Sequence, residues 1–180
     1  SGVSASWRCI EDPSGTVYEA VPTNPLPGAT VTAYYKDADT GERILWNADE
    51  WDQTNPLITD AVGFYAWDVP EGLWQVTFEK DGYESQESKW LEVAPPQTDV
   101  NASLVSMVSP VIESCVIGDS FAEVTFSKYM RPETVKALVL KDGNGKRIPY
   151  ILVYDTSEVS DAGEILARTY YLVYENYVAL

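Results

Sequence analysis

The side chains that enzymes use most often for acid–base chemistry are poorly represented in this sequence. It contains no histidine, the commonest general base and the commonest transition-metal ligand. A Ser-His-Asp or Cys-His arrangement is therefore impossible. Paired carboxylates remain among the 28 acidic residues, but a glycosidase also needs a deep cleft that small β-domains seldom provide. We expect a protein that is not an enzyme and that binds no cofactor.

Two clusters of acidic residues could supply oxygen ligands to calcium. The clusters are Asp37 with Asp39 and Glu42, and Asp49 with Glu50 and Asp52. Neither has the full spacing of a calcium loop, and acidic side chains are common in turns. We therefore expect solvated, turn-forming acids and no metal site.

A polar segment with two tryptophans is the best candidate for ligand binding. Its candidate residues are Trp46, Asp49, Trp51 and Asp52, with amides at Asn47, Gln53 and Asn55 nearby. Indole rings in a loop can stack on sugar faces while carboxylates and amides hydrogen-bond the hydroxyls. The same rings can equally cap one end of a β-sandwich or pack on a second domain. Both interpretations stay open.

The charge balance excludes some partners. Lys and Arg number 12 against 28 Asp and Glu, so the formal net charge is -16 and the field repels phosphate backbones and anionic lipids. No segment approaches the ~20 apolar residues of a membrane helix. We expect no nucleic acid partner and no membrane insertion. Because the N-terminus lacks the features of a signal peptide, we expect a mature chain or a fragment.

The two cysteines, Cys9 and Cys115, are far apart and match neither a redox pair nor a zinc pattern. Cysteine often behaves as a small buried hydrophobe, so two buried free thiols are expected. The alternative is a disulfide that would tie the N-terminal segment to the second half of the chain.

Alternation of apolar and polar residues dominates the chain and predicts an all-β protein. In the first half it predicts strands at 29–36 and 42–46, at 64–69 and 73–79, and at 89–93, with a long loop at 47–57. Pro70 and Gly72 lie where a type I turn favours them. We therefore predict a hairpin whose two strands each point a row of side chains into the core. The first strand contributes Tyr65 and Trp67, and the second contributes Trp74, Val76 and Phe78.

The alternation of apolar and polar residues continues in the second half of the chain, with strands and turns at different spacings. Ala122, Val124 and Phe126 share one face, "DGNG" predicts a hairpin turn, and "ARTYYLVY" predicts a strand near the C-terminus. The predicted architecture is two tandem β-sandwich domains, of immunoglobulin-like or prealbumin-like type, at residues 1–105 and 106–180. About 75 residues is short for a sandwich. We expect the second domain to be small, incomplete in this sequence, or completed by a neighbouring chain.

The first half resembles the carboxypeptidase regulatory-like family, a transthyretin-like β-sandwich of seven strands. The residues that match the family pattern in order are Thr59, Asp60, Gly63, Tyr65, Pro70, Gly72, Trp74, Val76, Gly82 and Tyr83. The match spans about residues 11–104 and consists of turns and core positions. The resemblance implies a β-sandwich fold, and it implies no catalytic activity.

Relatives of this family in pili and adhesins form an isopeptide bond between a first-strand lysine and a last-strand Asn or Asp, assisted by a buried acid. Glu79 lies where that acid would be, and Asn101 lies where the amide could be. No lysine precedes Lys36, however, so we predict no such cross-link and regard Glu79 as an exposed strand residue.

The second half, through "VTFSKYMRPETVKALVLKDGNGKRI", resembles the bacterial immunoglobulin-like domains of S-layer and other surface proteins. Together the two resemblances imply a structural or spacer module of a large secreted or cell-surface bacterial protein. Its expected partners are other domains of the same polypeptide. The alternative is a carbohydrate- or protein-binding module that uses the loop around Trp46 and Trp51.

Overall fold

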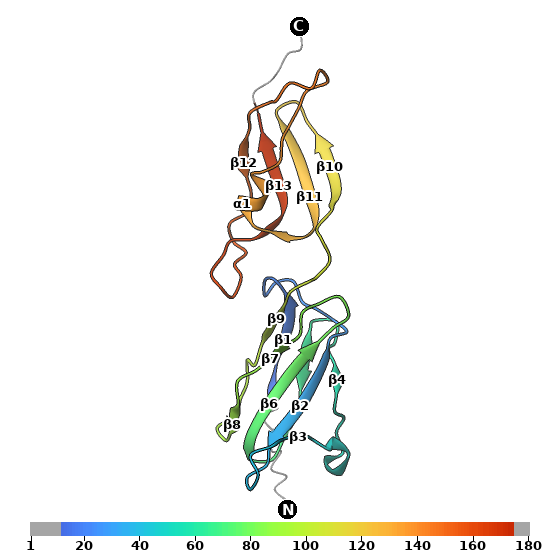
Figure 1. Ribbon diagram of the computed structural model, residues 1–180, viewed down its shortest axis with the longest axis vertical. Coiled ribbons are helices and arrows are strands. Elements are labelled where there is room, and N and C mark those ends of the chain that lie inside the picture. The colour runs from blue at the N-terminus through green and yellow to red at the C-terminus, as the bar shows by residue number, and fades with distance from the viewer. Residues whose placement is uncertain (1–11, 175–180) are drawn as a thin grey trace, which may run out of the picture. The chain divides into compact units, whose positions relative to one another are not determined.

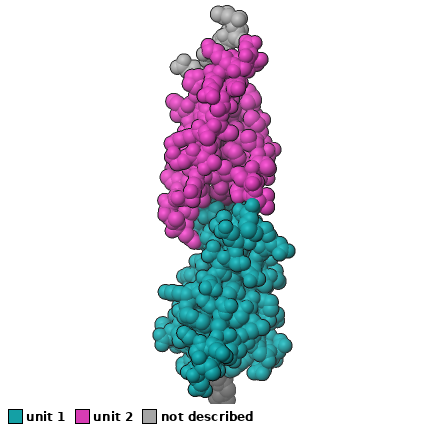
Figure 2. All heavy atoms as spheres, viewed as in Figure 1, with its two compact units in different colours: residues 1–107 teal, residues 108–180 magenta. Residues whose placement is uncertain are grey.

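The structure of the protein is a computed structural model that describes residues 12–174 (Figure 1). The chain divides into two compact units, Ser1–Met107 and Val108–Leu180 (Figure 2). Both are built from strands. Among the described residues, the helical segments are the 3-10 turn η1 (Ala48–Trp51) and the four-residue helix α1 (Pro132–Val135). The prediction of an all-β protein is confirmed.

Two sheets form the first unit. In one, β1 lies between an antiparallel β5 and a parallel β9; in the other, the order is β3-β2-β6-β7, with β4 paired to β2 and β8 to β6. The strands are β1 (Ser14–Glu19), β2 (Thr30–Lys36), β3 (Arg43–Leu45), β4 (Leu57–Ile58), β5 (Phe64–Ala66), β6 (Gly72–Glu79), β7 (Gln86–Glu87), β8 (Leu91–Val93) and β9 (Ala102–Leu104). The described part of this unit thus has nine strands where the resemblance implies seven. Two of the nine, β4 and β7, have only two residues each.

Alternation correctly predicts which side chains of the central strands face the core. On β2, Val31 and Ala33 are buried, and they lie opposite Phe78 and Val76 of β6. Rings from the two sheets meet inside, since the Tyr65 and Phe78 centroids are 5.6 Å apart in an edge-to-face arrangement. The first unit is therefore a β-sandwich-like domain with its core between the sheets.

The predicted hairpin around Pro70 is wrong. The inward residues Tyr65, Trp67, Trp74, Val76 and Phe78 are indeed buried. However, β5 pairs with β1, whereas β6 pairs with β2, β7 and β8, so the two strands belong to opposite sheets. Their rows of rings face each other across the core instead of lying side by side.

Backbone pairing explains this crossover. The N–H of Trp67 donates to Pro13 O and that of Val69 donates to Asp12 O, both at 3.1 Å, so this segment already has partners beside β1. Gly72, with φ 152°, then redirects the chain into the other sheet. The Trp74 indole N–H closes the turn by donating to Pro70 O at 2.9 Å.

The segment "TDAVGFY" joins the two sheets at one end of the sandwich. The Thr59 hydroxyl accepts from the Ala29 N–H and donates to Leu26 O, and the Asp60 carboxylate accepts from two backbone N–H groups within its own turn. Gly63 has φ 73°, and its carbonyl accepts from the Val17 N–H at 2.8 Å. The turn therefore brings the chain against β1, where a larger residue than glycine has no room.

The second unit contains one antiparallel sheet of order β10-β11-β13-β12. Its strands are β10 (Ile112–Ile117), β11 (Phe121–Met130), β12 (Ile151–Val153) and β13 (Ala167–Val173). Ala122, Val124 and Phe126 are buried on one face, as predicted, with Tyr170 and Leu172 of β13. The predicted turn after Leu140 is also present, because the Ile148 N–H donates to Leu140 O at 2.8 Å.

A second sheet, which a sandwich would need, is not formed within residues 108–174. Instead the core face is covered by Val135 of α1 and by partly buried side chains that include Leu138, Tyr150 and Tyr154. Long connections with turn residues form only isolated bridges, such as Lys141 with Arg147. The second unit is thus one sheet with a layer of loops.

Cys115 is exposed on β10, so the expectation of a buried thiol is wrong for this residue. It pairs with Val124 on the core face of the sheet, but β10 is an edge strand and all six of its residues are exposed. The covering layer therefore does not extend over this edge. Cys9 lies outside the described residues.

Replacing Gly63 by alanine should strongly destabilise the first unit, because the new Cβ would overlap the Val17 carbonyl oxygen. Gly41 is a matched control, since its φ of 72° is nearly that of Gly63 and nothing lies within 4 Å of its added Cβ. We expect Gly63→Ala to lower the free energy of unfolding by at least about 2 kcal/mol more than Gly41→Ala.

Urea denaturation followed by tryptophan fluorescence measures this difference. All six tryptophans precede residue 107, so the signal reports on the first unit. Equal losses in the two variants would show that the close approach to Val17 is not a constraint.

Candidate functional site

The two tryptophans of the predicted loop lie in different environments. Trp46 directly follows β3 and is 5% exposed, whereas Trp51 ends η1 and is 51% exposed. They do not form a matched pair of exposed rings. Trp46 belongs to the core of the first unit, and Trp51 stands at its surface.

Three buried indoles pack together beneath this surface. The Trp46 ring is edge-to-face with Trp74, at 5.3 Å between centroids, and with Trp67, at 6.5 Å. The N–H of Trp67 donates to Thr54 O and that of Trp74 donates to Pro70 O. Among the described residues, Trp46 Nε1 is the one buried side-chain polar atom without a hydrogen-bond partner.

Amides hold the loop in place rather than facing a ligand. The Asn55 side chain donates to Ala33 O and to Trp46 O, and it accepts from the Ala33 N–H at 2.9 Å. The Gln53 side chain makes a pair of hydrogen bonds with the backbone of Asp68. These two residues are therefore occupied, and the loop is fixed to both sheets.

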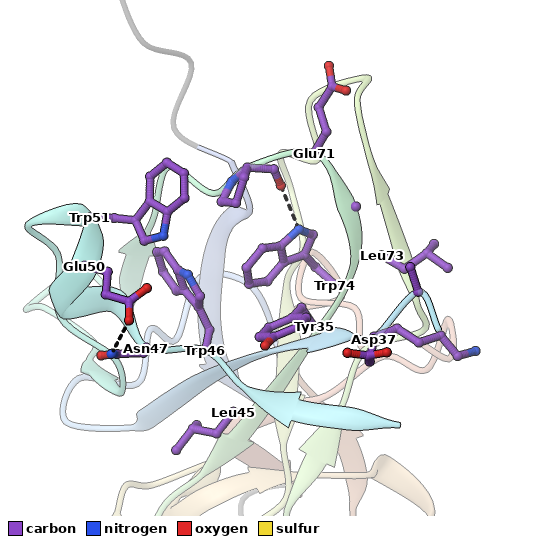
Figure 3. A pocket seen from close by; sticks show the side chains of 14 residues that line it. Tyr35, Asp37, Leu45, Trp46, Asn47, Glu50, Trp51, Glu71, Leu73 and Trp74 are labelled. Carbon is purple, nitrogen blue, oxygen red and sulfur yellow. Dashed lines mark hydrogen bonds between the residues drawn. The ribbon is translucent and has the colours of Figure 1, made fainter. Parts of the chain in front are cut away.

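A pocket of about 460 Å³ opens beside these rings. Its walls come from the end of β2, the segment 45–51 and the turn 70–74. Figure 3 shows the Trp46 ring between Trp51 and Trp74, with the nitrogen-bearing edge toward the space between them. Glu50 lies beneath Trp51, and its carboxylate accepts from Asn47 Nδ2 at 3.2 Å. Aromatic walls with a few polar groups are typical of small-molecule sites.

The structure brings together only part of the predicted set. Trp46 and Trp51 line the pocket, but Asp49 and Asp52 do not. Asp52 instead caps the C-terminal end of η1 with φ 55°, and its N–H donates to Asp49 O. The sequence interpretation missed Glu50 as a pocket residue, as well as the walls at Tyr35 and Trp74. Only the aromatic character of those two walls is visible in the sequence.

The acidic cluster at residues 37–42 forms a turn, as predicted. Asp37 Oδ1 accepts from the N–H of Thr40 at 2.8 Å and from that of Asp39 at 2.9 Å. These backbone hydrogen bonds, that of Thr40 first, lower the pKa of the Asp37 carboxyl. No group of three or more potential metal ligands is found within residues 12–174.

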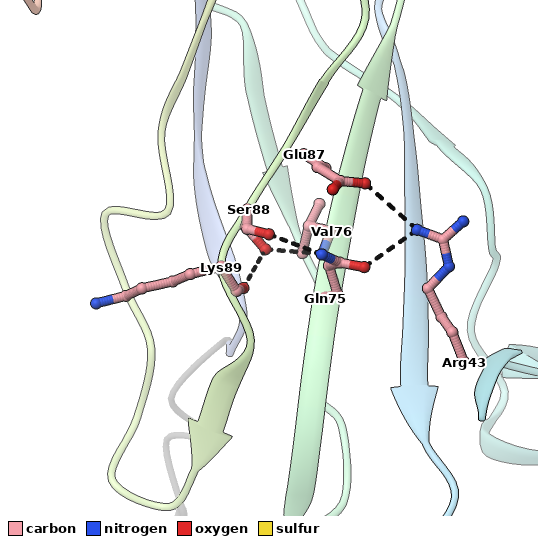
Figure 4. A network of polar contacts seen from close by, with 6 residues as sticks. All are labelled: Arg43, Gln75, Val76, Glu87, Ser88 and Lys89. Atoms are coloured by element: carbon pink, nitrogen blue, oxygen red, sulfur yellow. Dashed lines mark hydrogen bonds and ion pairs between the residues drawn. The ribbon is translucent and has the colours of Figure 1, made fainter. Parts of the chain in front are cut away.

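A second polar cluster, shown in Figure 4, is built around the buried side chain of Gln75. Gln75 accepts from Arg43 Nη1 at 3.1 Å and donates to Ser88 O at 2.9 Å. Arg43 also pairs with Glu87 at 3.4 Å and lies over the Tyr34 ring. The cluster therefore links β3 to β6 and β7 across the intervening strand β2.

The positions compared with isopeptide-forming relatives have other roles. Glu79 is exposed at the end of β6, as expected. Asn101 Oδ1 accepts from Thr16 N at 2.9 Å and from its hydroxyl at 3.2 Å, which joins β1 to the segment before β9.

None of the helices in the described part of the chain is long and apolar enough to cross a membrane.

The first unit is thus a β-sandwich-like module with an aromatic pocket at one end. Residues 14–105, about half of the sequence, match the carboxypeptidase regulatory-like domain, and the chain belongs to this family. The family is a generic, non-catalytic β-sandwich module. A search of curated proteins finds no match to the chain.

Loss of the Asn55 side chain should loosen the loop that carries both pocket tryptophans. Asn55→Ala leaves Ala33 N, Ala33 O and Trp46 O without this partner, and we expect the first unit to lose about 2 kcal/mol or more of stability. Asn47→Ala is the control, because its side chain is exposed and donates one described hydrogen bond, to Glu50, and it should change stability by less than about 0.5 kcal/mol. Fluorescence-detected urea denaturation compares the two; equal effects would mean that Asn55 does not fix the loop.

Proposed function

We propose that the chain is a non-catalytic structural, spacer or interaction module of a large secreted or cell-surface bacterial protein. The observation that carries this proposal is that two compact β units follow each other, each around its own hydrophobic core. Membership of a non-catalytic β-sandwich family supports it for the first unit. Modules with separate cores suit a polypeptide assembled from domains in series.

In this proposal the second unit is an immunoglobulin-like domain of the kind found in bacterial surface proteins. The strand β11 carries the "VTFS" pattern, and α1 begins at the proline that follows it. The exposed edge of β10 supports a domain that is completed by a neighbouring part of the polypeptide.

Labelling of cells from the source bacterium tests the location. An antibody against the purified chain should bind intact cells, or should detect the protein in the culture medium. Antibodies against a cytoplasmic protein serve as the control for lysis. Signal that appears only after the cells are permeabilised would contradict a secreted or surface-attached protein.

A second candidate function is ligand binding at the pocket that contains Trp46 and Trp51, with a carbohydrate or a protein as the ligand. One observation favours it: Trp46, which lines the pocket beside the exposed ring of Trp51, has a buried indole N–H without a hydrogen-bond partner. Buried polar groups are nearly always satisfied in folded proteins, so an exception at a pocket indicates a place for a ligand atom.

Arrays of glycans and of surface proteins test this second function. The native chain should bind a subset of the array, and Trp51→Ala should weaken that binding at least about tenfold by removing the exposed ring. Phe64→Ala, which truncates an exposed ring on the other sheet and outside the pocket, should bind as the native chain does. Blank arrays for the native chain would reject the ligand-binding function.

A further inference from the structure

We infer that the pocket binds a neutral sugar residue through three groups. In this inference the Trp51 ring stacks on the sugar, the Trp46 N–H donates to one hydroxyl, and the Glu50 carboxylate accepts from another. The inference rests on the proposal that this pocket is a ligand-binding site. It adds the chemical class of the ligand and a role for each side chain.

The unpartnered N–H of Trp46 requires an acceptor. Buried indoles usually find a hydrogen-bond partner, as Trp67 and Trp74 do here through backbone carbonyls. The edge-to-face contacts orient the Trp46 ring, but an aromatic face is only a weak acceptor. A ligand oxygen at this position would supply the missing bond.

The exposed ring of Trp51 offers a stacking surface for an apolar face of the same ligand. It lies beside Trp46 at the pocket, while Trp74 and Tyr35 form the opposite wall (Figure 3). One face of a pyranose ring presents C–H groups that match an aromatic ring, and its edges carry hydroxyls. A sugar thus combines the two surfaces that these residues require.

The charges around the pocket exclude anionic ligands. Its lining includes the carboxylates of Asp37, Glu50 and Glu71. Lys36, the one cation among the lining residues, lies 5.1 Å from the Trp90 ring centroid. A carboxylate, phosphate or sulfate ligand would therefore meet a repulsive field.

A hydroxyl fits this set of groups better than a peptide carbonyl. A carbonyl oxygen accepts hydrogen bonds but cannot donate to a carboxylate, whereas each hydroxyl can do both. Glu50 is already held by Asn47, which fixes its carboxylate beside the two indoles. In this inference one hydroxyl of a sugar ring accepts from the Trp46 N–H and another donates to the Glu50 carboxylate.

Access to the Trp46 N–H requires a movement, because Nε1 is buried in this conformation. Trp51 is the last residue of η1, and half of its surface is exposed. In this inference the Trp51 side chain rotates to admit the ligand, while the Asn55 hydrogen bonds to Ala33 O and Trp46 O continue to hold the loop. Binding should therefore change the fluorescence of the chain.

Calorimetric titration of the full chain with tetrasaccharides tests the inference. The neutral probes are cellotetraose, maltotetraose and chitotetraose, and the anionic probe is tetragalacturonic acid. We expect at least one neutral probe to bind and the anionic probe to bind at least about tenfold more weakly. Trp46→Phe, which keeps a ring but removes the N–H, should lower the affinity for the neutral probe about tenfold.

A matched pair of variants tests the carboxylate. Glu50→Gln keeps the size of the side chain but weakens its acceptor, and should lower the affinity several-fold. Glu79→Gln removes the same charge from an exposed side chain at the other end of β6, outside the pocket, and should leave the affinity unchanged. Equal effects of the two variants would mean that only net charge matters and would overturn the role of Glu50.

The outcomes separate this inference from the function on which it rests. Binding of a protein or an anionic glycan that is lost in Trp51→Ala would leave the pocket a ligand site but overturn the neutral sugar. No binding to arrays or probes would reject both. If Trp46→Phe does not fold, as judged by fluorescence and denaturation, the Glu50 and Glu79 variants and the comparison of neutral with anionic probes decide the result.

Discussion

The aromatic cluster between the two sheets is the interaction on which the first unit depends. Tyr65 and Trp67 approach it from the side of β5, and Trp74 and Phe78 approach it from β6, with edge-to-face contacts that include 5.6 Å between Tyr65 and Phe78. Rings of this size bury a large apolar area, and their geometry fixes how two sheets sit on each other. The Tyr65 hydroxyl also donates to Val100 O, so the cluster holds the segment before β9. The strand that closes the smaller sheet therefore relies on the same core.

Alternation predicts the inward face of a strand but not its neighbour. The rings predicted to face inward show this clearly, because Tyr65, Trp67, Trp74 and Phe78 are buried although β5 and β6 lie in opposite sheets. A proline and a glycine between two strands serve a hairpin or a crossover equally well. The choice between a hairpin and a crossover depends on whether the backbone of the first strand already has hydrogen-bond partners. For β5 those partners come from β1, about fifty residues earlier in the chain. The prediction of a second sandwich is not confirmed for a related reason, since strand patterns do not reveal whether a second sheet will cover the first.

The candidate site was only partly predictable because it is assembled from three separate segments. Polar composition marked residues 46–57 as a loop, but Trp46 continues the alternation of β3, where Ile44 is partly buried and Leu45 is exposed. That pattern could have identified Trp46 as a core residue. The walls at Tyr35 and Trp74 depend on the pairing of β2 with β6, which places these two residues opposite each other. No spacing within the loop carries that information.

One buried side-chain polar atom of the described residues, Trp46 Nε1, lacks a hydrogen-bond partner. The other buried indoles of the cluster donate to carbonyl groups, and Gln75 and Asn55 have all their principal partners, yet Trp46 Nε1 has none among the described residues. Leaving a buried donor unpaired costs about 1–3 kcal/mol, which the burial of a large ring can offset. A fold that fails to satisfy one group only where a pocket lies beside it has the arrangement expected of a functional position. The loss of stability there is the energy that a ligand with a suitable acceptor would recover on binding.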